Sequence, residues 1–395
     1  MTPGARVAAA IECLDAIAAA AREGGAAADT IIARYFLTRR YAGSKDRRAA
    51  RDLVYAVVRA IGDCPASGRG ALIGYARAAA LDLLDVFGSG GHAPAALVAG
   101  EPVSTPSPAP GWLRERLQAR FGEDTPTQLA ALLERAPHDL RVNRLKATRD
   151  DVIIDGAVAT PFAPNGLRTT LPLNVETLAA YRDGLIEVQD EGSQLAVDLC
   201  AAQPGMTVID LCAGAGGKAL ALAAAMGNAG RLIATDTDRG RLQRMTPRLE
   251  RAGVSIVERR LLDPGREAAA LGDLTGLADL VVIDAPCSGT GTWRRNPEAR
   301  WRLTPSRLAR LMAAQDSLLD LAAPLVKPGG VLVYIVCSLL PDEGEARTTA
   351  FQARGQFSRA PGRNPLGGPA VDTLVLTPGD HGCDGFYIAR MTRLC

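Results

Sequence analysis

Two short apolar stretches, each ending in Cys-Ser, constrain the fold of this chain more than any other feature. Residues 280–283 (Leu-Val-Val-Ile) lead into Asp284 and Cys287, and residues 331–336 (Val-Leu-Val-Tyr-Ile-Val) lead into Cys337. Each run is rich in β-branched residues and too short for a typical helix, which predicts two buried strands. Open α/β sheets bind ligands at the carboxyl ends of their strands, so we expect both thiols to face one crevice.

A buried, inert cysteine is the simplest alternative for each thiol, because free Cys behaves as a small apolar side chain. For a single Cys that alternative would be favoured. Two Cys at matching strand ends, one of them beside Asp284, favour a shared functional site instead. The chain has eight Cys and no Cys-x-x-Cys pair, which indicates free thiols in a reducing cytoplasm rather than disulfides or zinc sites.

Length and composition set broad limits on the remaining function classes. A chain of 395 residues predicts two or three domains. The net charge of +2 does not by itself indicate a nucleic-acid partner, and three His make His-based catalysis or metal binding an unfavourable hypothesis. No apolar run reaches membrane-spanning length. Charged residues interrupt the Ala-rich start of the chain, which therefore does not resemble a signal peptide.

The first 99 residues are predicted to form a helical domain, with amphipathic helices over 5–22, 28–41 and 45–61. Further helices are expected to about residue 99, with a flexible break at Gly88–Gly91. Between Arg34 and Arg59 there are eight Lys or Arg and two Asp. This excess fits a solvated helical surface and a phosphate-binding patch equally well. Residues 100–111 contain four Pro and predict a semi-rigid linker at a domain boundary.

Residues 112–192 predict a small α+β unit. Two short helices are followed by a strand in which Leu140, Val142 and Leu145 alternate with polar residues, so that the unit presents a basic face. From residue 193 to 395, strands alternate with helices, which is typical of a parallel sheet. Its first strands end near Asp210 and Asp236, and a third, over about 254–259, is followed by Asp263.

A glycine-rich turn follows the first of these strands and matches G-x-G-x-x-A from Gly214 to Ala219. Such a turn lets a ligand approach the backbone, and Asp236 at the end of the next strand can bind a ribose diol. Alone, the turn is shared by nicotinamide and methyl-donor sites. Acids at four strand ends disfavour a pyrophosphate and favour S-adenosylmethionine. The predicted donor-binding residues are Cys212, Ala213, Gly214, Ala215, Gly216, Gly217, Lys218, Asp236, Asp263 and Asp284.

Residues 293–302 carry two Trp and four Arg. A structural lid is one interpretation. We favour contact with substrate, because aromatic rings stack on bases while Arg binds phosphates.

Six motifs in order resemble the RsmB/NOP/Sun family of RNA 5-methylcytosine methyltransferases over about residues 111–395. They are Arg141–Lys146, Val188–Gln194, Asp210–Lys218, Asp284–Gly291, Cys337–Leu339 and His381–Tyr387. Residues 1–100 are similar to the helical NusB-like domain of some members, which points to bacterial enzymes of small-subunit ribosomal RNA. Two departures from the family pattern stand out: Gly214-Ala215 replaces Ala-Pro, and Val336 replaces Thr.

The resemblance implies a fold and an activity. The fold is a class I methyltransferase Rossmann-like sheet (193–395), preceded by an α+β RNA-recognition subdomain (112–192) and an all-α NusB-like RNA-binding domain (1–99). The activity is transfer of a methyl group from S-adenosylmethionine to cytosine C5 through a Cys–C6 intermediate. Cys337 would be the nucleophile, Cys287 would assist release, Asp284 would bind the cytosine edge, and Lys218 would support the site.

The resemblance also implies the partners, 16S ribosomal RNA or an early small-subunit particle. We further expect no membrane partner, no metal and a monomeric protein. Three alternatives stay open. One is methylation of transfer RNA or large-subunit ribosomal RNA. A second is a nicotinamide oxidoreductase, and a third is a non-catalytic RNA-binding assembly factor. DNA methylation is disfavoured, because those enzymes carry Pro-Cys-Gln where this chain has Ser288 after Cys287.

Overall fold

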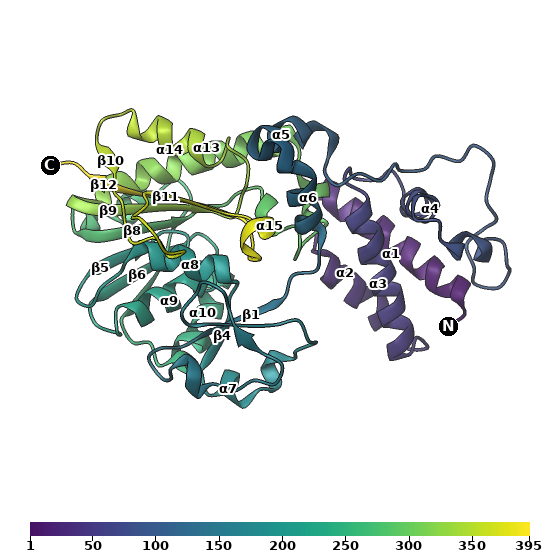
Figure 1. Cartoon of the computed structure of the whole chain (residues 1–395), viewed down its shortest axis with the longest axis horizontal. Helices are drawn as coiled ribbons and strands as arrows, with labels where there is room; N and C mark the ends of the chain where they lie inside the picture. The colour runs from purple at the N-terminus through teal and green to yellow at the C-terminus, as the bar shows by residue number, and fades with distance from the viewer. The chain divides into compact units, whose positions relative to one another are not determined.

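The computed structural model describes residues 1–395, and its internal contacts divide the chain into two compact units. The helical unit comprises Met1–Glu134 and Thr292–Arg307, and the sheet unit comprises Arg135–Gly291 and Leu308–Cys395. Figure 1 traces both from the purple N-terminus to the yellow C-terminus. These units do not coincide with the four segments expected from the sequence, whose boundaries stay predictions.

The helical unit confirms the three helices expected near the N-terminus. Its helices are α1 (Pro3–Glu23), α2 (Ala28–Leu37), α3 (Ser44–Ala60), α4 (Gly68–Ala78), α5 (Arg114–Phe121), α6 (Thr125–Leu133) and α12 (Ala299–Arg302). The Thr2 hydroxyl caps α1 by accepting a hydrogen bond from the Ala5 N–H. The expected break at Gly88–Gly91 agrees with the structure, in which three of these residues adopt positive φ. The expected continuation of helices to residue 99 is wrong, because no helix forms over residues 92–99.

The predicted linker, residues 100–111, is packed along α3 and α4. The Ser104 N–H donates to the Gly70 carbonyl (3.1 Å), and the Ser107 N–H donates to that of Ala60 (2.9 Å). A Cβ at Gly74 would collide with the Ser104 carbonyl oxygen, so the glycine allows this close approach. This proline-rich segment is therefore packed within the helical unit.

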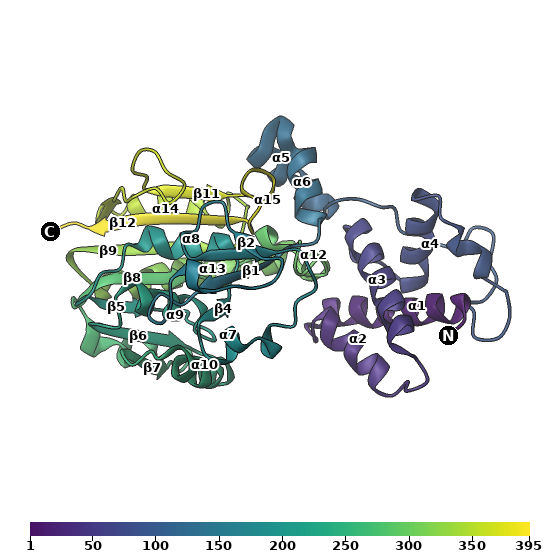
Figure 2. The same cartoon turned by 60° about the horizontal axis from the view of Figure 1, so that its bottom comes forward.

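The sheet unit contains a large sheet in the order β10-β12-β9-β8-β5-β6-β7, with β11 paired to β12. Figure 2 shows these strands from β12 at the top to β7 at the bottom. The strands are β5 (Thr207–Asp210), β6 (Arg231–Asp236), β7 (Val257–Leu261), β8 (Ala278–Asp284), β9 (Val326–Val336), β10 (Phe357–Arg359), β11 (Thr373–Leu376) and β12 (Phe386–Arg393). The neighbours from β9 to β7 pair in parallel, which confirms the expected α/β class.

Helices cover both faces of the large sheet (Figure 1). Residues of α8 (Glu191–Cys200), α9 (Gly217–Ala225) and α10 (Arg239–Ala252) share one buried apolar cluster with the strands. Residues of α13 (Pro305–Ala322) and α14 (Glu345–Gln352) share another. Leu280 to Ile283 of β8 are at most 2% exposed, as expected for a strand buried on both faces.

A small antiparallel sheet precedes α8, in the order β2-β3-β1-β4. Its elements are β1 (His138–Val142), β2 (Val158–Ala159), β3 (Gly166–Thr169), α7 (Ala179–Arg182) and β4 (Ile186–Val188). The expected basic face of β1 is wrong for Arg141, which is buried, as is Asn143. Short helices α11 (Glu267–Ala270) and α15 (Pro378–His381) complete the unit. No helix of the chain is both long and apolar enough to cross a membrane.

Candidate active site

One edge of the large sheet collects the side chains singled out from the sequence. Because β5, β6, β8 and β9 run in parallel, their carboxyl ends meet at this edge. Asp210, Asp236 and Asp284 are the last residues of β5, β6 and β8, and Cys337 follows β9 directly. The chain leaves β5 toward β6 on one side and reaches β8 on the other, so the edge contains a topological switch point, where such sheets bind ligands.

The two thiols lie side by side at this edge. The Sγ atoms of Cys287 and Cys337 are 3.3 Å apart, within hydrogen-bonding distance, and both residues are partly exposed. The expectation that they share one crevice agrees with this distance, while their chemical roles stay predictions. The hydrogen bond with Cys337, together with burial, raises the pKa of the Cys287 thiol well above its usual value.

An ion pair lies beside the thiols. The Lys218 ammonium is 2.6 Å from the Asp284 carboxylate, whose side chain is 33% exposed, while that of Lys218 is only 9% exposed. Burial lowers the pKa of Lys218, but the charge and hydrogen bond of Asp284 raise it further, and the net shift is upward. Lys218 is therefore a fixed cation, and Asp284 is the member of the pair that reaches solvent.

The glycine-rich turn between β5 and α9 leaves open space beside its backbone. A Cβ built at Gly214 or Gly217 would meet no atom within 4 Å. Gly214 has φ +56°, a conformation that glycine adopts without strain and that disfavours the Ala found there in the family pattern. The open backbone fits a ligand lying against the turn. Cys212, Ala213 and Ala215 lie in the same turn.

Asp236, at the end of β6, is hydrogen-bonded to the glycine-rich turn. One carboxylate oxygen accepts the Gly214 N–H (2.9 Å), and the other accepts the Asp238 N–H (2.7 Å). The remaining lone pairs can accept ribose hydroxyls. Asp263 lies two residues beyond β7 and is exposed. No group of three or more His, Cys, Asp or Glu in the structure could hold a metal ion.

Three side chains that sequence reasoning did not assign to the site form hydrogen bonds with backbone carbonyls at the glycine-rich turn. Arg141 of β1 donates to the Gly217 carbonyl (3.0 Å), and Gln189 contacts the same oxygen (3.3 Å). Arg248 of α10 donates to the Ala215 carbonyl (2.6 Å). Two of the three lie in motifs that the family resemblance had marked, so the motif pattern was the available signal.

Asp210, the last residue of β5, lies at the same edge of the sheet. The side chain is fully buried. Burial, with a smaller contribution from the nearby Asp284 carboxylate, raises the pKa of Asp210 to about 7. Removing Asp210 from water thus makes its neutral form accessible near neutral pH.

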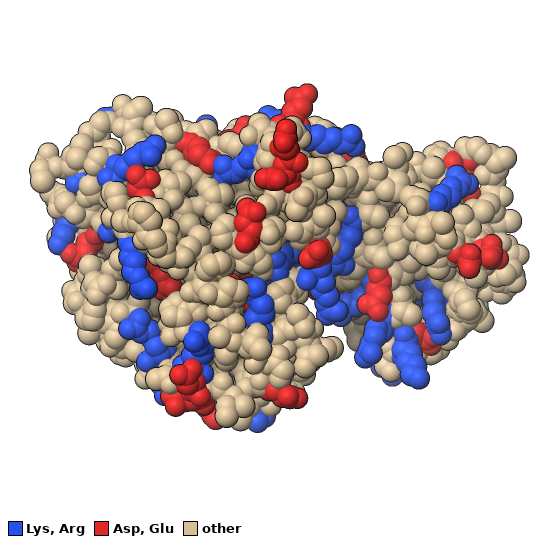
Figure 3. Space-filling model, in the orientation of Figure 1, with Lys and Arg blue, Asp and Glu red and all other residues tan.

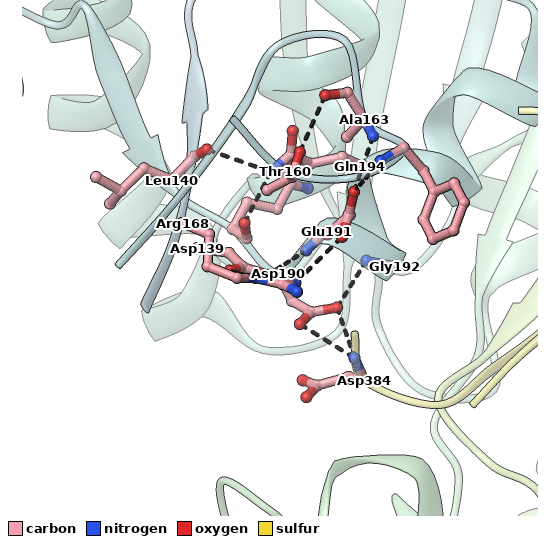
Figure 4. Close-up of polar contacts among 12 residues, drawn as sticks. Asp139, Leu140, Thr160, Ala163, Arg168, Asp190, Glu191, Gly192, Gln194 and Asp384 are labelled. Atoms are coloured by element: carbon pink, nitrogen blue, oxygen red, sulfur yellow. Dashed lines mark hydrogen bonds and ion pairs between the residues drawn. The ribbon is translucent and has the colours of Figure 1, made fainter. Parts of the chain in front are cut away.

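The motif Val188–Gln194 joins the small sheet to the large one (Figure 4). The buried Glu191 carboxylate pairs with Arg168, which also binds Asp139 through two hydrogen bonds of 2.7 Å. Asp190 accepts the N–H groups of Gly192 and Asp384, which caps α8 and attaches the segment before β12. These acids therefore position the elements around the site.

The Trp- and Arg-rich stretch 293–302 belongs to the helical unit. Arg300 and Trp301 are 1% and 3% exposed and donate hydrogen bonds to backbone carbonyls of that unit. The expectation that this stretch contacts substrate is therefore wrong for these two residues, because their donors and rings are already engaged in a protein core.

Two family models match parts of this chain. The family model described as 16S rRNA methyltransferase RsmB/F matches residues 197–392, and a model described as an RsmF/B-like ferredoxin-like domain matches residues 109–176. The chain is 35% identical over 301 residues to a protein of Synechocystis sp. strain PCC 6803 named "Probable ribosomal RNA small subunit methyltransferase B". The match covers 72% of this chain and 66% of that relative.

Two solved structures are similar to the structure of this chain. "Crystal Structure of PH0851" aligns over 99% of both chains with a TM-score of 0.76 and 26% identity. The structure titled "NSun6 from Pyrococcus horikoshii with SFG" covers 72% of this chain and 98% of its own, with a TM-score of 0.63. At 21% identity this second likeness concerns the fold alone. By its two family models and its curated relatives, this chain belongs to the RsmB/F family of methyltransferases.

Proposed function

We propose that this chain transfers a methyl group from S-adenosylmethionine to C5 of cytosine in RNA, with small-subunit ribosomal RNA as its substrate. The observation that carries the proposal is the pair of thiols 3.3 Å apart at the carboxyl edge of the sheet. The Lys218–Asp284 ion pair lies in the same site. Membership of the RsmB/F family supports the donor and the substrate class.

The donor-binding residues would be the turn from Cys212 to Lys218 together with Asp236 and Asp263. When bound, S-adenosylmethionine supplies an electrophilic methyl group. The open backbone at Gly214 and Gly217 leaves room for it. The carboxylate of Asp236 suits ribose hydroxyls and would repel a pyrophosphate.

Cytosine C5 is a poor nucleophile, which is why the reaction needs a thiolate. The Cys337 thiolate forms a bond to C6, and the electron pair displaced from the C5–C6 double bond makes C5 nucleophilic. After C5 gains the methyl group, its proton leaves to a base, the double bond re-forms and the S–C6 bond breaks, which returns the thiolate. Cys287, with its raised pKa, would assist this release.

Asp284 would bind the cytosine edge. Its partly exposed carboxylate can accept a hydrogen bond from the exocyclic amine, and Lys218 holds that carboxylate in place. A base reaches such a crevice only after it leaves a stack, so single-stranded or loop RNA is the natural substrate.

The helical unit would supply RNA affinity. Figure 3 shows Lys and Arg side chains gathered over the lower part of helices α2 and α3. The exposed cations from Arg34 to Arg48 are here called the α2–α3 basic face: Arg34, Arg40, Lys45, Arg47 and Arg48. Clustered cations provide sequence-independent attraction to phosphates. The cytoplasmic location and the monomeric state stay predictions.

Replacing each thiol separately tests the proposal. Cys337→Ala should abolish methyl transfer and all covalent capture of RNA. Cys287→Ala should accumulate a denaturant-resistant protein–RNA adduct, because release is impaired. Cys395→Ala is the matched control, since this exposed thiol lies at the C-terminus. An active Cys337→Ala protein would overturn the proposed chemistry.

Substrate choice needs a separate measurement. Labelled methyl transfer to 16S ribosomal RNA, 23S ribosomal RNA and transfer RNA should favour the first, with 5-methylcytosine as the product. A preference for another RNA would overturn the substrate assignment and leave the thiol chemistry standing.

A further inference from the structure

We propose that Glu343 is a positioning residue of this site: its buried carboxylate fastens the loop after β8 to the loop after β9, so that both thiols face one crevice. The inference deepens the proposed function and rests on it. Glu343 lies between β9 and α14 and is fully buried. None of the sequence motifs assigned it a role.

The first set of contacts joins Glu343 to the loop that carries Cys287. The next residue, Ser288, donates its backbone N–H to Glu343 Oε1 (2.9 Å) and its hydroxyl to Oε2. A carboxylate that accepts both donors of one residue restricts that residue's position and orientation. The neighbouring Cys287 is thereby restrained as well.

The second set of contacts joins the same carboxylate to the loop that carries Cys337. The Ser338 hydroxyl donates to Glu343 Oε2 (2.5 Å) and lies 3.1 Å from the Ser288 hydroxyl. Ser338 is fully buried. One carboxylate oxygen therefore binds the residue that follows each thiol, which couples the two loops through a single atom.

Further hydrogen bonds hold Glu343 itself in place. Gln315 of α13 donates to Glu343 Oε1 (3.0 Å) and to the Pro286 carbonyl (3.0 Å). The Tyr334 hydroxyl of β9 donates to the Glu343 carbonyl (2.8 Å). Because three elements converge on it, the carboxylate is fully supplied with donors, which a buried charge requires.

A parallel connection explains why the loops remain close. The Thr290 hydroxyl accepts the Leu339 N–H (2.9 Å), and the Gly291 N–H donates to the Cys337 carbonyl (3.0 Å). These bonds fix the backbones of the two loops. Glu343 adds the restraint on the residues next to the thiols. Its negative charge also contributes, after the Cys337 hydrogen bond and burial, to the raised pKa of Cys287.

Glu343→Gln is the sharpest test, because it keeps the size of the side chain while replacing one acceptor oxygen with a donor NH₂ group. We expect kcat for RNA methylation to fall about 100-fold, the scale of a misplaced reacting group. KM for S-adenosylmethionine should stay within about twofold, because Glu343 does not touch the glycine turn. Glu250→Gln is the matched control, an exposed acid on α10.

A second readout separates positioning from general structural support. In a Cys337→Ser background, the pH dependence of Cys287 alkylation by iodoacetamide is followed by peptide mass spectrometry. Glu343→Gln should shift it to lower pH, because a negative charge that opposes the thiolate is gone. A wild-type kcat would overturn the proposal, and so would an unshifted alkylation profile.

Two further results keep the outcomes distinguishable. If Glu343→Gln does not fold, Ser338→Ala removes the link to the second loop, and a normal kcat in that variant would overturn the proposal. If Cys337→Ala retains activity, the proposed function itself fails. An essential Cys337 with a fully active Glu343→Gln protein would refute the positioning role alone.

Discussion

Two arginine-rich stretches of the helical unit have similar compositions, but one is exposed to solvent and the other is largely buried. The stretch from Arg34 to Arg59 lies on α2 and α3 and keeps the α2–α3 basic face in solvent. The stretch 293–302 is largely buried, with Trp293 fully buried and Arg300 1% exposed. Both combine Arg with aromatic residues, the pattern associated with RNA contact. The pattern alone therefore does not separate a nucleic-acid surface from a protein core.

Orphan backbone carbonyls explain the burial of the second stretch. Arg300 donates to the carbonyls of Val58 and Arg59 in the last turn of α3, and the Trp301 Nε1–H donates to that of Ile61 (2.8 Å). The last carbonyls of a helix lack intrahelical partners and carry partial negative charge. Cationic and N–H donors of a distant segment can satisfy them, as here.

The exposed stretch offers different groups to solvent. Leu37 and Tyr41, at the end of α2 and just beyond it, are 74% and 72% exposed. They lie in sequence among the cations of the α2–α3 basic face. An exposed ring near exposed cations suits base stacking with phosphate contacts.

The largest loss of stability is expected for Trp301→Ala. Loss of a buried Trp and its hydrogen bond should destabilise the helical unit by about 3–5 kcal/mol. Urea unfolding followed by circular dichroism measures this, with Trp112→Ala, at a partly exposed Trp, as the control. An unchanged midpoint with weakened RNA binding would restore substrate contact as the role of this stretch.

Arg300→Lys should cause the next largest loss of stability, although it conserves the charge. A Lys cannot reproduce the planar set of donors that reaches several carbonyls, so we expect a loss of about 1–3 kcal/mol. Thermal unfolding of Arg300→Lys beside Arg307→Lys, an exposed arginine of the same unit, checks it. Equal stability of the two variants would contradict the capping explanation.

Tyr41→Ala should leave the fold intact and weaken RNA binding. Removing one aromatic ring that stacks on a base costs about 1–3 kcal/mol of binding free energy. Fluorescence anisotropy with a single-stranded ribosomal RNA fragment measures it, and Tyr41→Phe should bind almost normally because the ring is retained. Equal weakening in both variants would exclude stacking.

The smallest change in free energy is expected for Lys45→Ala combined with Arg48→Ala. Stability should change by less than about 0.5 kcal/mol, because both side chains are exposed. The slope of log affinity against log salt should fall by about 0.7 for each RNA phosphate that the variant no longer neutralises. Arg51→Ala is the control, since Arg51 already pairs with Asp29. An unchanged salt slope would show that RNA does not bind this face.

Much of the sheet unit could be predicted from local patterns. The apolar runs that became β5, β6, β8 and β9 are buried, β-branched and bounded by turns, so their strand state did not depend on distant residues. The carboxyl-edge position of Asp236, Asp284 and Cys337 then follows from parallel pairing. The helices near the N-terminus were similarly predictable from their periodicity.

The errors arose where a side chain's partner is distant in sequence. Arg141 was expected on an exposed basic face, yet it is buried and binds the Gly217 carbonyl. The prolines of 100–111 were expected in a semi-rigid linker between domains, yet this segment packs on glycines of α4. In both cases the residue type was compatible with either environment.

The sequence by itself determined the fold class, the family and the edge of the sheet at which the chemistry would lie, because strand periodicity and motif order are local properties. Tertiary structure alone decided that the two sulfur atoms lie 3.3 Å apart and that Glu343 links their loops. It also decided which arginines stay in solvent. Hydrogen bonding and burial depend on groups brought together from distant parts of the chain, and no local pattern records them.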